Sequence, residues 1–104
     1  MPDIELGGKK IETDVEGFLK NPDDWSVEFA QVVARELGLA LTDRHWEVIH
    51  FCRQDFKSNG QPPGPRRITK YGGFSTKELY ELFPGGPAKF AAKMAGLRKP
   101  TICV

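Results

Sequence analysis

Glycine and proline interrupt this chain so often that only short strands and helices fit between them. The sequence has 104 residues, of which 11 are glycine and 8 are proline. Glycine permits tight turns and ends helices, and proline prevents a helix from continuing. We therefore expect one small α+β domain over residues 1–96, in which an N-terminal β-hairpin or meander packs on an array of about five short helices. Residues 97–104 are expected to form a flexible C-terminal arm.

The first half of the chain predicts a hairpin and two helices. Residues 4–6 and 9–11 alternate apolar and polar side chains around two glycines, which supply the positive φ angles of a two-residue turn. Ser26 is expected to cap a helix that ends before Gly38, and Thr42 a second helix over residues 43–58. One face of the second helix is apolar and carries Cys52 near its middle.

The second half predicts three shorter helices. A proline-rich connector over residues 61–65 precedes a helix over residues 66–71. Ser75 and Glu78 have the spacing of a capping box and open a helix that runs through Phe83. A proline then suits the first position of a last helix over residues 88–95, which Gly96 stops.

The charge of the chain is balanced overall but uneven along its length. The formal net charge of +1 argues against a strongly electrostatic partner. Residues 57–100, however, carry nine lysines and arginines against only two carboxylates, Glu78 and Glu81. The C-terminal half therefore predicts a basic surface, suited to an acidic protein partner or to RNA.

Neither a membrane segment nor a metal site is expected from the sequence. The N-terminus has no apolar run of signal-peptide length, and no later segment is apolar enough to cross a bilayer. We therefore expect a cytoplasmic protein whose two cysteines are free thiols. The cysteines lack zinc-ligand spacing, and His45 and His50 miss the i, i+4 spacing of a helical metal pair. No bound cofactor is expected either.

Cys103, one residue from the C-terminus, is the main candidate for chemistry. The eight residues after Gly96 can extend about 26–29 Å, so this thiol can reach another protein's active site. The terminal carboxylate would raise the pKa of the thiol, whereas Arg98 and Lys99, or Arg66 and Lys70 if the tail folds back, would lower it. An accidental surface thiol is the alternative interpretation.

The other polar and aromatic candidates have structural interpretations. Cys52, within an apolar helix face, is expected to behave as a small buried hydrophobe. Trp25 and Trp46 are expected to anchor the core, with His45 at its edge. Arg66 and Lys70 lie one helical turn apart, which fits either a functional cationic patch or a solvated face.

Two C-terminal blocks carry a family resemblance. Leu82-Phe83-Pro84-Gly85-Gly86-Pro87-Ala88-Lys89 and the tail over residues 95–104, with its penultimate cysteine, closely resemble the DsrC/TusE family of sulfur-relay proteins. Residues 12–19, 45–49 and 63–70 match as well, so the resemblance covers essentially the whole chain. It implies an α+β fold with a mobile arm, on which Cys103 carries sulfur as a persulfide or forms mixed disulfides and trisulfides with partners.

The resemblance also implies the partners of such a carrier. The sulfur donor would be similar to TusBCD or DsrEFH, and the acceptor would be the tRNA 2-thiouridylase MnmA or a sulfite reductase. Arg66, Lys70 and Lys99 would contact these partners. No direct contact with nucleic acid or a membrane is implied.

Some residues depart from the family pattern. Ala92 stands where the DsrC branch has a second cysteine, so the single-cysteine pattern resembles TusE and a relay toward tRNA 2-thiouridine. Arg98 replaces the usual proline, and the connector between Lys70 and Lys77 is shorter than in typical TusE proteins. These changes leave a second hypothesis open, a DsrC-like redox or regulatory partner of sulfite reductase or of sulfur-oxidation machinery. A third, a small DNA-binding protein, is disfavoured by the low net charge.

Overall fold

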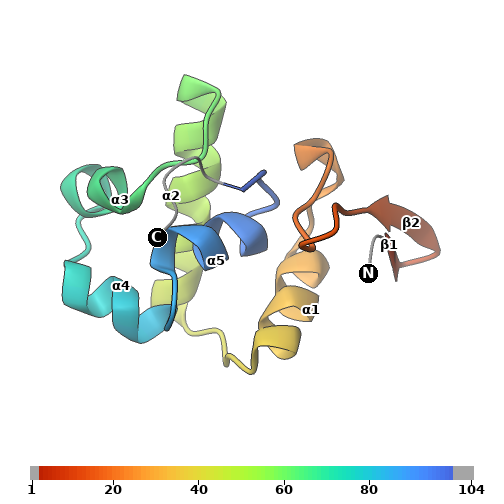
Figure 1. The fold of residues 1–104 in the computed structure, drawn as a ribbon, viewed down its shortest axis with the longest axis horizontal. Helices are drawn as coiled ribbons and strands as arrows, with labels where there is room; N and C mark the ends of the chain where they lie inside the picture. The colour runs from red at the N-terminus through yellow and green to blue at the C-terminus, as the bar shows by residue number, and fades with distance from the viewer. Residues whose placement is uncertain (1–2, 100–104) are drawn as a thin grey trace.

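The computed structural model describes residues 3–99, which form a two-stranded hairpin and five α-helices (Figure 1). The elements are β1 (Asp3–Leu6), β2 (Lys9–Glu12), the 3-10 turn η1 (Pro22–Asp24), α1 (Val27–Leu37), α2 (Asp43–Asn59), α3 (Pro65–Gly72), α4 (Thr76–Leu82) and α5 (Pro87–Met94). α5 lies at the centre, in contact with each of the other four α-helices. The expected α+β architecture is confirmed.

The hairpin forms as its sequence predicts. β1 and β2 pair antiparallel with Leu6 opposite Lys9, so the turn consists of Gly7 and Gly8. Both glycines have positive φ, 56° and 81°, which side chains other than glycine rarely adopt. Buried Ile11 joins this hairpin to the hydrophobic core.

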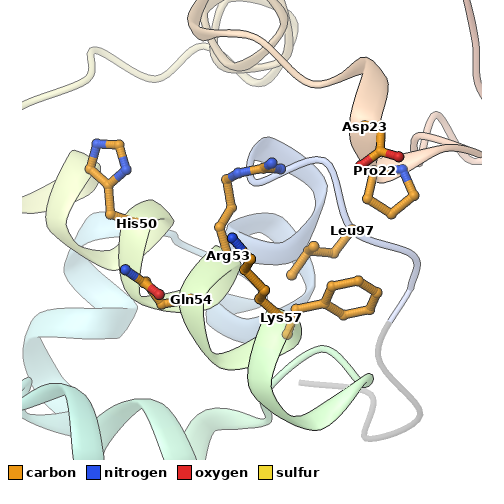
Figure 2. Close-up of a pocket in the computed structure, with 8 residues that line it drawn as sticks. Pro22, Asp23, His50, Arg53, Gln54, Lys57 and Leu97 are labelled. Atoms are coloured by element: carbon orange, nitrogen blue, oxygen red, sulfur yellow. The ribbon is translucent and has the colours of Figure 1, made fainter.

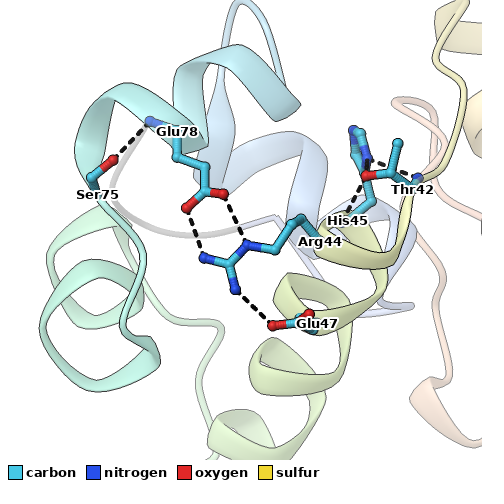
Figure 3. Close-up of polar contacts among 6 residues, drawn as sticks. All are labelled: Thr42, Arg44, His45, Glu47, Ser75 and Glu78. Atoms are coloured by element: carbon cyan, nitrogen blue, oxygen red, sulfur yellow. Dashed lines mark hydrogen bonds and ion pairs between the residues drawn. The ribbon is translucent and has the colours of Figure 1, made fainter.

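Local capping groups explain where the first two helices begin and end. The Ser26 Oγ accepts the backbone N–H of Phe29, and Gly38 ends α1 with φ of 72°. At the start of α2, Thr42 and His45 cap each other: the Thr42 N–H donates to His45 Nδ1 over 3.0 Å, and Thr42 Oγ1 accepts from the His45 backbone (Figure 3). The His45 Nε2 then donates to the Leu82 carbonyl over 2.8 Å, which ties α2 to the end of α4.

The capping box expected at Ser75 forms only in half. The Ser75 Oγ accepts the Glu78 backbone N–H over 3.1 Å. The Glu78 carboxylate, however, receives two hydrogen bonds from the Arg44 guanidinium on α2, at 2.8 and 2.7 Å (Figure 3). A tertiary ion pair thus uses the side chain that the local motif would have used. The helix ends elsewhere differ from expectation by a residue or so, as is usual for frayed termini.

The core gathers around α5. The small side chains Ala88, Ala91 and Ala92 are almost fully buried and allow neighbouring helices to approach closely. Leu97, expected as the first residue of the arm, is only 1% exposed and its N–H donates to the Ala92 carbonyl. The packed body therefore includes Leu97. Trp25 and Trp46 are half-buried against this core.

No helix in the described residues is long and apolar enough to cross a membrane.

Candidate functional site

The candidate site is the point where the chain leaves the folded body toward Cys103. Cys103 belongs to residues 100–104, which lie outside the described residues. We call residues 97–99 the tail root, because they connect α5 to the cysteine. The structure therefore describes the part of the folded body to which the cysteine-bearing segment is attached.

The end of α5 is held by two side chains from distant elements. The Trp25 Nε1 donates to the Met94 carbonyl over 2.7 Å, and the Arg53 Nη1 donates to the Ala95 carbonyl over 2.7 Å. The Arg53 guanidinium also stacks 4.2 Å above the Trp25 ring. Burial lowers the pKa of Arg53, and the nearby carboxylate of Asp23 acts in the opposite direction. These contacts satisfy carbonyls that the last turn of a helix leaves without partners, and they fix the start of the tail.

A groove of about 530 Å³ runs beside the tail root (Figure 2). The residues that line it come from η1, α2 and the tail root: Pro22, Asp23, His50, Arg53, Gln54, Phe56, Lys57 and Leu97. α2 lines one side of the groove, mostly with side chains that end in nitrogen atoms. The carboxylate of Asp23 lies on the other side. Leu97 is the residue of the tail root that lines this groove.

The two cations of the tail root contact separate segments of the body. The Arg98 Nη2 donates to the Gly60 carbonyl at the end of α2 over 3.2 Å, and its guanidinium lies 5.6 Å from the centroid of the Phe56 ring. The Lys99 Nζ donates to both carboxylate oxygens of Glu16, at 3.1 and 3.4 Å. Glu16 lies in the loop that follows β2.

Arg66 and Lys70 lie on exposed positions of α3, one turn apart as expected. Lys70 Nζ is 5.4 Å from the centroid of the Tyr71 ring. Among the described residues, no hydrogen bond or ion pair links Arg66 or Lys70 to the tail root. The structure thus leaves the expected partner-binding residues in two places, α3 and the tail root.

Arg67, between them in sequence, has a structural role. Its guanidinium makes two hydrogen bonds to the carboxylate of Asp55, at 3.1 and 2.6 Å, and these bonds raise its pKa. Asp55 is only 8% exposed, so Arg67 compensates a carboxylate that would otherwise be buried without a counter-charge.

Cys52 is unsuited to exchange chemistry. Its side chain is 1% exposed in the core, as the apolar stripe predicted. Burial, with a smaller contribution from the charge of Asp55, raises the pKa of the thiol far above its ordinary value. Because the thiolate is the reactive form, this cysteine is inert in the folded protein. In the part of the chain that the structure describes, no group of three His, Cys, Asp or Glu side chains could hold a metal ion.

Neither Arg53 nor Glu16 stands out as a site residue in the sequence. Arg53 occupies the polar edge of α2, where a charged residue is the ordinary choice. Glu16 is separated from Lys99 by 83 positions, and nothing local distinguishes it from other exposed carboxylates. Only the folded chain brings either residue to the tail root.

Comparisons with known proteins agree on one family. The family model described as "DsrC like protein" matches residues 5–104, which includes Cys103. The dissimilatory-type sulfite reductase subunit gamma of Nitratidesulfovibrio vulgaris is 44% identical over 105 residues and is covered completely, as is this chain. The sulfurtransferase TusE of Yersinia pestis is 43% identical over 108 residues, which cover 97% of this chain and 99% of that protein.

Solved structures show the same fold. The NMR structure of Allochromatium vinosum DsrC aligns with a TM-score of 0.89 at 42% identity, covering 98% of this chain and 97% of that one. The oxidized gamma subunit of dissimilatory sulfite reductase from Archaeoglobus fulgidus aligns with a TM-score of 0.82 at 35% identity, covering 99% and 100%. This protein therefore matches these relatives in both sequence and fold over nearly its whole length, and it belongs to the DsrC-like family.

Proposed function

We propose that this protein is a sulfur carrier that accepts a sulfane sulfur on Cys103 and passes it to a partner protein. The observation that carries the proposal is the contrast between its two cysteines. Cys52 is sealed in the core with a raised pKa, so exchange falls to the penultimate cysteine. The name sulfurtransferase carried by the TusE of Yersinia pestis, at 43% identity, supports the same activity.

The transfer is a thiol exchange that needs no metal and no oxidant. The Cys103 thiolate attacks the outer sulfur of a persulfide on the donor. A sulfur–sulfur bond forms at Cys103 while the donor's bond breaks, and the donor cysteine leaves as a thiolate. The proton of the persulfide stays with the transferred sulfur or exchanges with water. Delivery repeats the exchange, with an acceptor cysteine as the nucleophile.

The two exposed basic sites fit contact with such partners. We assign Arg66 and Lys70 on α3, and Lys99 at the tail root, to partner binding, because charged groups steer protein encounters. The donor would be of the TusBCD or DsrEFH kind. Ala92, buried on α5, takes the position of the second DsrC cysteine, which favours a TusE-like relay to a tRNA thiouridylase.

A second candidate function is a partner of sulfite reductase that works without a second tail cysteine. The 44% identity to the gamma subunit from Nitratidesulfovibrio vulgaris, over the full length of both chains, favours this alternative. The two candidates share Cys103 as the reactive residue and differ in the acceptor.

Mass spectrometry tests the carrier chemistry. After incubation with a persulfidated donor protein, the wild-type protein should gain one sulfur atom on the C-terminal peptide. Cys52→Ala should gain the same, because Cys52 is buried, and Cys103→Ser should gain none. Sulfur on Cys52, or an unmodified wild-type protein, would contradict the proposal.

A chase experiment separates the acceptors. Protein loaded with radioactive sulfur on Cys103 is mixed with purified tRNA thiouridylase or with purified sulfite reductase. Transfer of the label to the thiouridylase supports the tRNA relay, and transfer to sulfite reductase supports the second candidate.

A further inference from the structure

We propose that Glu16, Arg98 and Lys99 form a releasable clamp that limits the reach of Cys103, and that an acidic partner surface opens it by competing for the two cations. The inference rests on the proposed function of Cys103. The clamp would position the thiol before a partner binds, and the partner would present an acidic surface.

The clamp holds the tail root from two sides. Arg98 donates to the Gly60 carbonyl at the end of α2, and the neighbouring Lys99 donates to both carboxylate oxygens of Glu16. Because consecutive residues bind separate segments of the body, the chain between them has little freedom to swing. The two contacts therefore give Lys99 a defined position on the body.

The loop that carries Glu16 is itself fixed to the body. The Asp14 Oδ1 accepts the backbone N–H groups of Glu16 and Phe18, each over 2.9 Å, and Phe18 is buried. A Cβ on Gly17 would lie 2.9 Å from the Lys93 side chain, so this loop packs closely against α5. Glu16 thus presents its carboxylate from a rigid turn, which allows it to act as one half of a clamp.

The clamp changes how far the thiol can travel. With Lys99 held, four residue-to-residue steps lead from it to Cys103, a span of at most about 13–14 Å. With the clamp open, the chain pivots at buried Leu97, and six residues span about 20–22 Å. Because a residue before proline favours extended backbone conformations, Pro100 further limits the backbone conformations open to Lys99 while the clamp is closed.

The contacts are suited to release by a partner. The side chains of Lys99 and Glu16 are 40% and 44% exposed, and exposed ion pairs contribute little and are screened by salt. Val15, next to Glu16, is 89% exposed and offers an apolar contact beside the ion pair. The surface that fits this region combines an apolar contact for Val15 with carboxylates for Arg98 and Lys99, placed around the opening of a thiol-accepting pocket.

Heteronuclear NOE measurements on the amide of Lys99 test the clamp without any transfer assay. In the wild-type protein this value should approach those of the folded body, and in Glu16→Gln it should fall toward the value of a free chain. Glu28→Gln removes the same charge from an exposed site on α1 and should leave it unchanged. The charge exchange Glu16→Lys with Lys99→Glu should restore the wild-type value. An identical NOE in wild type and Glu16→Gln overturns the clamp.

The acidic partner is tested with a hexaglutamate peptide as probe. Titration of the wild-type protein should lower the NOE of Lys99, and sodium chloride at equal ionic strength should do so less. Equal effects of peptide and salt overturn the partner chemistry. Persulfide loading of Cys103 from a small-molecule donor should be the same in wild type and Glu16→Gln. If neither protein loads while the NOE difference persists, the proposed function fails and the clamp stands.

Discussion

Gly96 is the residue at which the chain turns out of α5 toward the tail root. Its φ of 75° belongs to the left-handed region, and a Cβ there would lie 2.5 Å from the Trp25 ring. The same tryptophan holds the Met94 carbonyl and stacks under Arg53. Gly96 is therefore required twice, once for the turn out of α5 and once for the close approach of the indole.

We predict that Gly96→Ala destabilises the protein more than Gly38→Ala. Gly38 has a similar φ of 72°, but a Cβ added there would have no atom of another residue within 4 Å. The control should lose about 1–2 kcal/mol from the left-handed conformation alone. Gly96→Ala must also displace Trp25, so its loss should be larger. Urea denaturation measures both, and equal losses would show that the contact with Trp25 has no energetic weight.

At the scale of elements, the Arg44–Glu78 pair joins α2 to α4. The Arg44 guanidinium also hydrogen-bonds Glu47 and stacks 4.4 Å from the centroid of the Phe74 ring. The hydrogen bonds from Arg44 lower the pKa of the Glu78 carboxyl. Such a carboxylate stabilises the fold above its unfolded pKa, about 4.3 for glutamate, and the contribution is lost as the pH falls through the lower folded value.

We therefore predict a difference in acid stability between two glutamine variants of α4. The free energy of unfolding of Glu78→Gln should fall less steeply below about pH 4.3 than that of the wild type. Glu81→Gln, an exposed change on the same helix, should keep the wild-type slope. Urea titrations at several pH values measure the slopes. A wild-type slope in Glu78→Gln would show that the ion pair contributes nothing.

The helices could be predicted from sequence because their signals are local. The residues that begin or end a helix act within one turn of the backbone, as do Ser26, Thr42, Pro87 and the terminating glycines. Each helix boundary therefore depends on residues close to it in the sequence. The role of Glu78 could not be predicted in this way, since the Arg44 side chain that takes its carboxylate lies 34 positions away.

For the whole molecule, the exposed basic residues of α3 divide into one that pairs with a buried carboxylate and two that do not. Arg67 neutralises buried Asp55, while Arg66 and Lys70 face solvent. The sequence predicted the basic half of the chain but not this division. Contacts between segments far apart in the chain, such as Lys99 with Glu16 and Leu97 with the core, depend on the assembled fold and leave no periodic pattern.

We predict that Arg66→Gln with Lys70→Gln changes partner encounter and leaves the fold intact. Its melting temperature should match the wild type, because exposed charges contribute little to stability. The rate of sulfur transfer from a donor protein should fall at low salt and depend less on ionic strength. Arg67→Gln should instead lower the melting temperature. An unchanged transfer rate and salt dependence in the double variant would remove α3 from partner binding.

Under the proposed carrier function, the burial of Cys52 determines how much sulfur one molecule can carry. A second accessible thiol would let a bound sulfur migrate within the chain, or close an internal bridge and release it as sulfide. Because Cys52 is buried in the core and Cys103 is the other cysteine of the sequence, we expect each molecule to accept one sulfur atom per loading. Throughput then scales with the number of carrier molecules and their turnover between donor and acceptor, and the protein cannot act as a reservoir.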